Sequence, residues 1–379
     1  MDTPDPLYLD FNATTPIDPR VVEAMLPWLT THFGNPSSAH VYGQRARAAV
    51  ERARAQVASL VGVRPEGVVF TGGGTEANNH AIAGAARLRP GGTLVAGAVE
   101  HPAVLEVCRR LTADGHALRL LPVDRDGRVD TAAAASVIGD GCALLSVMLA
   151  NNEVGTLQPV PELAVLARAR GALTHSDCAQ AVGKVPVSLP DLGVDMISLA
   201  GHKLYAAKGV GALCLRADLE LPNLMQGAAH ERGRRPGTEN VASIVGLGAA
   251  CALAGQDLAA EAARLHRLRE LLAHLLMAAH PEAVVHGAGA ARLPNTLSIA
   301  FPGRTAPAIL ARLTTVAVSA GAACHGADAV GSHVLAAMGV APRVAQGTLR
   351  ISLGRTTTAT DIETAAAAIA AAVSAAPVA

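Results

Sequence analysis

Aromatic residues are scarce in this chain of 379 residues. It contains four Phe, three Tyr and one Trp, which together make up 2% of the sequence. Proteins that hold single-stranded nucleic acid stack its bases on aromatic rings, so this composition disfavours that class of function. Basic and acidic residues are balanced at 31 each, so the chain also lacks the positive field that attracts a phosphate backbone. We therefore expect no direct nucleic-acid partner.

Paired cysteines and long apolar runs are also missing. No two cysteines have CxxC spacing, which argues against a zinc ribbon, another metal site or a disulfide framework. The amino terminus lacks the basic and apolar segments of a signal peptide, and no uninterrupted apolar run reaches the roughly 18 residues of a membrane span. We expect a cytoplasmic protein without membrane contact. The six cysteines are Cys108, Cys142, Cys178, Cys214, Cys251 and Cys324.

Lysine is almost absent, with three copies against 28 arginines. All three copies, Lys184, Lys203 and Lys208, lie within 25 residues of one another. A lysine amine can lose its proton and attack a carbonyl group, whereas the guanidinium of arginine stays protonated. The three retained lysines are therefore candidates for covalent chemistry, and spacing alone leaves all three possible.

Short apolar runs alternate with helix-like segments from about residue 45 to residue 250. This alternation predicts an α/β domain with a mostly parallel sheet and helices on both faces. Residues 241–275 have the periodicity of one long helix, and the rest of the chain predicts a smaller α+β unit. We expect a large domain at 15–255 and a small domain formed by 1–14 and 256–379. The expected strands are 68–70, 94–99, 117–123, 143–149, 172–177, 194–199, 210–215, 295–301, 316–319 and 348–353.

A glycine-rich turn at residues 72–76 follows the first of these strands and opens an expected helix. Glycine lets backbone N–H groups approach an anion closely, and a helix start adds partial positive charge. Thr75 is a candidate both for the helix N-cap and for a phosphate ligand. The turn lacks the Lys-Ser/Thr of a nucleotide P-loop and the spacing of a dinucleotide fingerprint. It predicts either a phosphate site of another kind or only a tight turn.

Polar residues follow three more expected strands, where ligand crevices lie in sheets of this type. The carboxylate of Asp177, with Gln180 three residues further on, is suited to hold a protonated ring nitrogen or to cap a helix. His101 is suited to stack on a planar cofactor, to move protons or to cap the next helix. Lys203, beside His202, is suited to form a Schiff base once desolvated, or is a solvated loop lysine.

Two residues of the expected small domain are further candidates. Cys324 lies among small residues and glycines, where a thiolate is accessible to react. Arg350 lies in an expected strand, from which its guanidinium either binds a carboxylate or forms a surface ion pair. A third feature is the loop at 230–240, rich in charge and glycine, which predicts a subunit contact or an anion site.

Taken in order along the chain, these motifs resemble the cysteine desulfurase family, which are pyridoxal-phosphate enzymes of the class V aminotransferase fold. The likeness runs from about residue 8 to residue 355. It implies a fold-type I architecture, with a seven-stranded, mostly parallel sheet in the large domain and the cysteine loop in the small one. The matching segments are GNPSSAH (34–40), FTGGGTEANN (70–79), EHPAVL (100–105), ANNEVGTLQP (150–159), HSDCAQAVGK (175–184), GHKLYAAKGVGAL (201–213), HERGRRPGTEN (230–240) and SAGAACHG (319–326).

The resemblance implies pyridoxal 5′-phosphate as the cofactor and assigns residues to it. Lys203 would hold the cofactor covalently, and His101 would stack on its ring and assist proton transfer. Asp177 would pair with the ring nitrogen, and Gln180 would bond the phenolic oxygen, with Asn152 beside it. The residues implied for the phosphate are Gly74, Thr75, His202 and, from the second subunit of a homodimer, Thr238.

The resemblance also implies the reaction. Arg350, with help from Asn152, would bind the carboxylate of L-cysteine, and Cys324 would accept the sulfur as a persulfide while L-alanine is released. A protein acceptor, such as an iron–sulfur scaffold or a thiolation enzyme, would then take the sulfur. Three departures from the family pattern occur: Ala200 replaces a usual serine, Cys178 replaces a usual alanine, and residues 228–229 replace a glycine pair.

Two other functions compete with this interpretation. A selenocysteine lyase uses the same cofactor and has a similar cysteine segment and glycine turn. A sulfur-relay scaffold without catalysis would bind partners through the Cys324 segment, although the presence of Lys203, His101 and Asp177 disfavours it. A nicotinamide dehydrogenase is excluded because no GxGxxG follows a strand.

Overall fold

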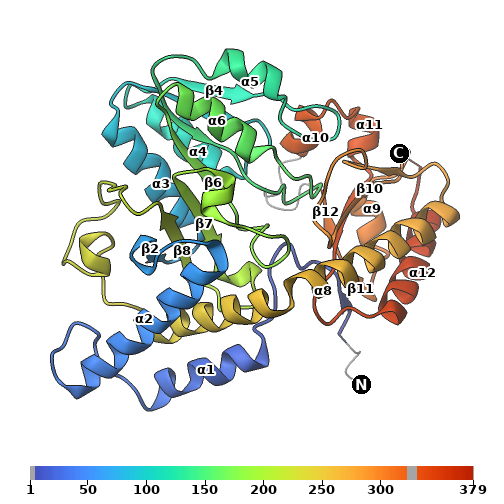
Figure 1. The fold of residues 1–379 in the computed structure, drawn as a ribbon. Coiled ribbons are helices and arrows are strands. Elements are labelled where there is room, and N and C mark those ends of the chain that lie inside the picture. Colours follow the sequence, from blue (N-terminus) through green and yellow to red (C-terminus); the bar gives the residue numbers. More distant parts are fainter. Residues whose placement is uncertain (1–4, 322–330, 379) are drawn as a thin grey trace.

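The computed structural model describes residues 5–321 and 331–378 of the chain (Figure 1). Two α/β units lie side by side, and the long helix α8 (Val241–Ala279) runs from one into the other. Helices α1 (Pro19–Thr30) and α2 (Val41–Val61) project from the large unit, away from the small one. The predicted α/β class is therefore confirmed.

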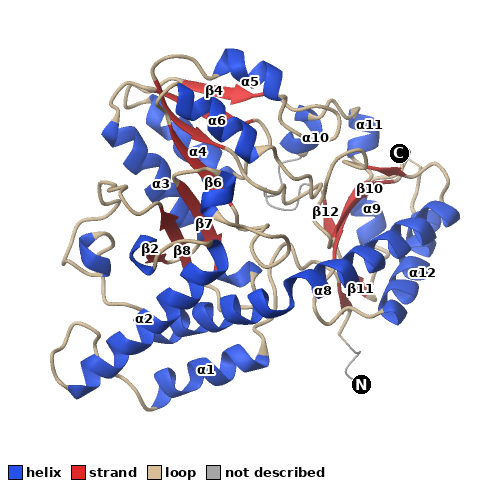
Figure 2. Cartoon of the chain, in the orientation of Figure 1, coloured by secondary structure: helices blue, strands red, loops and turns tan. Residues whose placement is uncertain are grey.

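The large unit is built on a seven-stranded sheet in the order β2-β8-β7-β6-β5-β3-β4 (Figure 2). All seven strands expected between residues 68 and 215 are present. Only β8 runs antiparallel to its neighbours, so the sheet is mostly parallel, as expected. The strands are β2 (Val68–Thr71), β3 (Thr93–Gly97), β4 (Leu118–Leu121), β5 (Cys142–Ser146), β6 (Leu173–Asp177), β7 (Met196–Ala200) and β8 (Gly211–Leu215).

Helices cover both faces of this sheet because the buried strands are apolar on both sides. Successive residues of one strand enter different cores: Val68 and Phe70 pack toward α2, α6 and α8, whereas Val69 packs toward α3 and α4. The same alternation holds along β8, as the two-residue period of a strand requires. The other helical segments of this unit are α3 (Gly74–Leu88), α4 (Pro102–Thr112), α5 (Thr131–Val137), α6 (Val160–Ala169), α7 (Leu189–Leu192), η1 (Pro65–Gly67), η2 (Gly201–Lys203) and η3 (Glu231–Gly233).

The small unit contains a four-stranded antiparallel sheet in the order β12-β13-β10-β9. The expected strand at 316–319 is split, because β11 pairs instead with the amino-terminal strand β1 in a separate two-stranded sheet. The strands are β1 (Leu7–Tyr8), β9 (Val284–Val285), β10 (Thr296–Ala300), β11 (Val316–Ala317), β12 (Ser319–Ala320) and β13 (Thr348–Ser352). The helices are α9 (Ala306–Leu310), α10 (His333–Ala337), α11 (Pro342–Ala345) and α12 (Ala359–Ala375).

Helix α8 belongs to both units. Its residues up to Ala254 pack in the core of the large unit, and those from Leu265 onward pack in the core of the small unit with Leu9. Among the described helices it alone has the length and hydropathy of a membrane span, but half of its most apolar stretch is buried. This burial is what a core helix requires. The division of the chain near residue 255 remains a prediction, and the change of core falls just beyond it.

Candidate active site

A cavity of about 830 Å³ opens at the carboxyl ends of the parallel strands. This edge of the sheet is where ligand crevices form, because each strand end there releases a loop that carries side chains. The cavity brings together nine of the residues predicted for the site, and they come from both units. These residues are Gly74, Thr75, His101, Asn152, Asp177, Gln180, His202, Lys203 and Arg350.

The glycine turn lies at the rim of this cavity. Helix α3 begins at Gly74 and its N-cap is Gly73, so the expectation that Thr75 caps the helix is wrong. The exposed Thr75 instead lines the cavity beside the helix start. Strand β8 passes close behind the turn: a Cβ at Gly211 would lie 2.7 Å from the carbonyl carbon of Gly73. Glycine at 211 therefore lets the turn sit against the sheet, with its amide groups near the cavity.

Asp177 ends β6 and faces the cavity with its carboxylate held on both oxygens. Asn78 on α3 donates to one oxygen at 2.7 Å, and the backbone N–H of Ala179 donates to the other at 2.9 Å. Beneath it, the imidazole of His175 bonds two serine hydroxyls, and burial lowers the pKa of this histidine to about 4. A neutral His175 leaves the Asp177 carboxylate without a cationic partner from below. The Asp177 carboxylate is thus available to a cation in the cavity.

His101 caps the next helix, which is one of its predicted roles, and it also lies at the cavity. Its Nδ1 accepts a hydrogen bond from the backbone N–H of Ala103 at 3.0 Å, so it is the N-cap of α4. Its ring also lines the cavity. Because Nδ1 is an acceptor, the remaining ring nitrogen carries the proton when the imidazole is neutral. Capping therefore fixes both the position and the tautomer of the ring.

Lys203 also lines the cavity, in the short helix η2 that follows β7. Its amine donates to the backbone carbonyl groups of Asn12 and Ala13, the latter at 2.7 Å. The neighbouring His202 approaches the hydroxyl of Thr14 at 3.2 Å. Burial and the charge of Lys203 lower the pKa of His202 to about 4, so its imidazole is neutral at pH 7. The amino-terminal segment thereby closes one side of the site.

Arg350 enters the cavity from β13 of the small unit. Its side chain is buried, and one terminal nitrogen pairs with the carboxylate of Asp10 at 2.9 Å while the other donates to the carbonyl of Asn152 at 3.2 Å. The predicted surface ion pair is wrong as to burial, since the exposed fraction of Arg350 is 2%. Its Nε atom is buried and has no hydrogen-bond partner among the residues that the structure describes. A buried donor of this kind is costly unless a ligand satisfies it.

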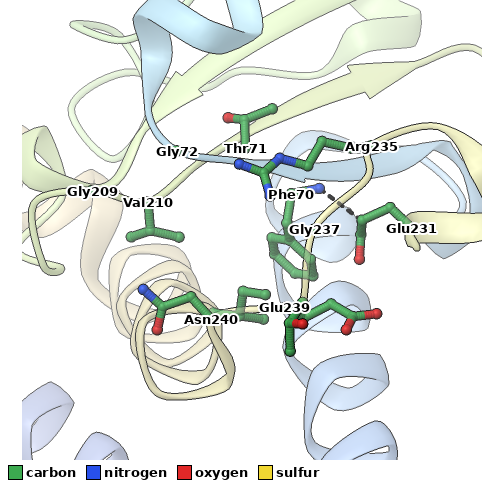
Figure 3. Close-up of a pocket in the computed structure, with 12 residues that line it drawn as sticks. Phe70, Thr71, Gly72, Gly209, Val210, Glu231, Arg235, Gly237, Glu239 and Asn240 are labelled. Atoms are coloured by element: carbon green, nitrogen blue, oxygen red, sulfur yellow. Dashed lines mark hydrogen bonds between the residues drawn. The ribbon is translucent and has the colours of Figure 1, made fainter. Parts of the chain in front are cut away.

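Thr238 lies outside this cavity. It is exposed and lines a pocket of about 230 Å³, which shares Gly72 and Val210 with the cavity. Figure 3 shows this pocket. The loop that carries it is anchored by Glu231, whose carboxylate bonds the guanidinium of Arg54 and the backbone N–H of Phe70 at 2.9 Å (Figure 3). Thr238 therefore does not line the cavity of its own subunit. Its predicted role in the phosphate site of a second subunit remains a prediction.

Cys324 falls outside the described residues, but the other five cysteines are free and buried. Burial raises the pKa of each of these thiols, to about 11 for Cys142 and about 12 for Cys108 and Cys251. It raises the pKa of Cys178 and Cys214 as well. A thiol with a raised pKa supplies little thiolate at neutral pH. None of the five is suited to act as a nucleophile.

Two residues of the site were missed from the sequence. Asn78 supports Asp177, and the buried Asn12 bonds across the site to Thr296 at 2.8 Å and accepts on its carbonyl from Gln180 at 2.9 Å. Asn78 lies in the segment FTGGGTEANN (70–79), and Asn12 lies near the start of the chain. A pairing between residues about 100 to 280 positions apart leaves no signal in one sequence.

Comparison with known proteins places these features in a family. The class-V aminotransferase family matches residues 7–364. The cysteine desulfurase NifS of Azotobacter vinelandii is 45% identical over 361 residues, covering 94% of this chain and 90% of that protein. A solved NifS-like protein has a TM-score of 0.91 at 35% identity, covering 97% of this chain and 99% of its own.

A third relative has been solved with a ligand. The structure of SspA in complex with cysteine has a TM-score of 0.81 at 32% identity, covering 92% of this chain and 98% of that one. The sequence family, the identity over nearly the full length and the shared fold agree. The chain therefore belongs to the class-V aminotransferase family and, within it, to the cysteine desulfurases.

Proposed function

We propose that this protein converts L-cysteine to L-alanine and passes the sulfur to Cys324 as a persulfide, with pyridoxal 5′-phosphate as its cofactor. The observation that carries the proposal is the meeting of Lys203, Asp177 and Arg350 in one cavity at the strand ends. An amine, a carboxylate and a buried guanidinium are the groups needed to hold an aldehyde cofactor and an amino acid together.

The residues present fit this cofactor. Asp177 offers a fixed carboxylate to the ring nitrogen, His101 a planar ring, and Lys203 an amine for the aldehyde. The amide groups at the start of α3, with Thr75 and the neutral His202, suit a phosphate. Ala200 lies close to the start of α3, because its methyl group is 3.1 Å from where a Cβ of Gly74 would be. As an alanine it adds no hydroxyl to the phosphate site. When bound, the cofactor supplies an electron sink.

The protein's own side chains bind the substrate, remove a proton and accept the sulfur. Arg350 binds the substrate carboxylate with its guanidinium, which fixes the orientation of the amino acid. The Lys203 amine removes the proton from the substrate Cα. The Cys324 thiolate then attacks the substrate sulfur. The bond between that sulfur and carbon breaks as the new sulfur–sulfur bond forms, and the reduced carbon takes up protons to give alanine, so no external oxidant is required.

The test is an assay of alanine release from L-cysteine by the protein reconstituted with pyridoxal phosphate. We expect alanine, and in Arg350→Met we expect kcat/KM to fall by about 10²-fold, mainly through KM, because a charge-assisted hydrogen bond is lost. Turnover of selenocysteine with no turnover of cysteine would instead assign the protein to the lyases. Absence of both reactions in a protein that binds no pyridoxal phosphate would favour a non-catalytic scaffold.

We further propose that the protein is a homodimer in which Thr238 completes the phosphate site of the other subunit. Helix α1 and the start of α2 expose apolar side chains: the exposed fraction is 66% for Leu29 and 81% for Phe33, whose ring stacks on that of Tyr42. An apolar face of this kind is typical of a subunit interface. Leu29→Asp is expected to convert a species of twice 38.4 kDa to a monomer in analytical ultracentrifugation. A wild-type monomer would contradict the proposal.

A further inference from the structure

A second buried amine lies behind the cofactor site. Lys184 follows β6 by seven residues, its side chain is 9% exposed, and its Nζ donates to the side-chain oxygen of Gln180 at 2.7 Å. In the part of the chain that the structure describes, no carboxylate pairs with it. Lys184 is therefore a buried amine that is bonded to a neutral amide.

The surroundings of Lys184 disfavour its charged form. Burial lowers its pKa to about 7, and the positive charges of Lys203 and Arg350 act in the same direction. A buried amine without a counter-charge costs folding free energy, because its ammonium form loses hydration. A methionine of similar length would fill the same space without this cost. The presence of lysine here calls for a role beyond packing.

The contact determines which way the Gln180 amide faces. An ammonium group donates and cannot accept, so it selects the amide oxygen of Gln180 and turns the amide nitrogen toward the cavity. That nitrogen donates to the Asn12 carbonyl at 2.9 Å, and the Lys203 amine donates to the same carbonyl. A flipped amide would place its NH₂ group against the ammonium. The two lysines are thus joined through Gln180 and Asn12.

We propose that Lys184 is a positioning residue that holds Gln180 with its amide nitrogen directed at the phenolic oxygen of the cofactor. This inference rests on the proposed function, because it requires pyridoxal phosphate in the cavity. Lys184 itself does not reach the reacting atoms. It fixes a hydrogen-bond donor at Gln180, and a fixed donor favours the anionic form of the phenolic oxygen.

The inference is tested on the reconstituted holoenzyme by following the cofactor absorbance as a function of pH. In Lys184→Met we expect the midpoint of the absorbance change to rise by at least about half a pH unit, because loss of the fixed donor favours the protonated form. In a Gln180→Leu background, Lys184→Met should add no further shift, since the route through the amide is already removed.

Thermal unfolding of the protein without cofactor separates this role from a purely structural one. A lysine whose pKa is lowered in the folded state destabilises that state at pH values below its unfolded pKa, so the free energy of unfolding increases as pH rises above about 7. Lys184→Met should therefore leave Tm at pH 7 unchanged or raised. The matched control is Arg269→Met, a buried cation of α8 that bonds the Leu293 carbonyl at 2.6 Å. It should lower Tm and leave the midpoint unmoved.

An unmoved midpoint in Lys184→Met, with cofactor bound, would overturn the inference, as would a drop in Tm without a spectral change. A full additional shift in the Gln180→Leu background would overturn the route through Gln180. If the wild-type protein binds no pyridoxal phosphate, the proposed function fails first, and the two failures are thereby distinguishable.

Discussion

Lys203→Arg is expected to lower the rate of alanine release from L-cysteine by at least about 10³-fold, which is within the range of a lost general base. Arginine keeps the positive charge and can still reach the carbonyl groups of Asn12 and Ala13 that hold the Lys203 amine. It cannot lose its proton at neutral pH, so it can neither form the covalent link to the cofactor nor remove the substrate proton. The variant should fold, because its charge and contacts are retained.

The rate of alanine release is measured together with the mass of the peptide that contains Lys203. After borohydride reduction of the holoenzyme, the peptide that contains Lys203 should carry the cofactor in the wild type and should lack it in Lys203→Arg. The control is Lys208→Arg, at the exposed lysine that sequence spacing left as an alternative, where the label on Lys203 should remain. Label on Lys184 or Lys208 in the wild type would contradict the assignment.

The sheet could be predicted from the sequence because its strands are short, apolar and regularly separated. Each of the seven strands lies within three residues of its expected bounds. Burial of most of them on both faces favours apolar runs, although the edge strand β4 is partly exposed. The polar residues that follow those strands were expected to line a crevice for a different reason, which is that ligand sites of such sheets form at the carboxyl ends of the strands. The split of 316–319 was not predictable, because pairing of Val316 with Leu7 joins segments more than 300 residues apart.

The site was only partly predictable. Position at or just after a strand end is enough to indicate Lys203, Asp177 and His101 as site residues. Asn78 lies inside α3 instead, and its bond to Asp177 depends on how that helix packs on the sheet. The burial of Arg350 depends likewise on how the two units meet, because its partners Asp10 and Asn152 come from other parts of the chain. Contacts of this kind are set by tertiary packing.

Cys324→Ser is expected to abolish sulfur transfer while leaving the cofactor site intact. The five described cysteines are buried with raised thiol pKa values, so they offer no alternative acceptor, and a serine hydroxyl is too weakly acidic to attack sulfur. Both flanks of the segment lie at the site: Ser319 is 3.4 Å from the Arg350 guanidinium, and Ser332 bonds Glu153, the neighbour of Asn152.

Mass spectrometry after incubation with L-cysteine measures this transfer. One sulfur atom adds about 32 Da, which should appear on the peptide containing Cys324 and be removed by a reducing thiol. Two oxygen atoms add nearly the same mass but resist such reduction, so reversal identifies the persulfide. The matched control is Cys178→Ser, beside Asp177, which should retain the added mass on Cys324. Because the substrate carbon can be reduced only if a sulfur acceptor is oxidised, continued alanine release by Cys324→Ser without added thiol would mean that another group in the cavity accepts the sulfur.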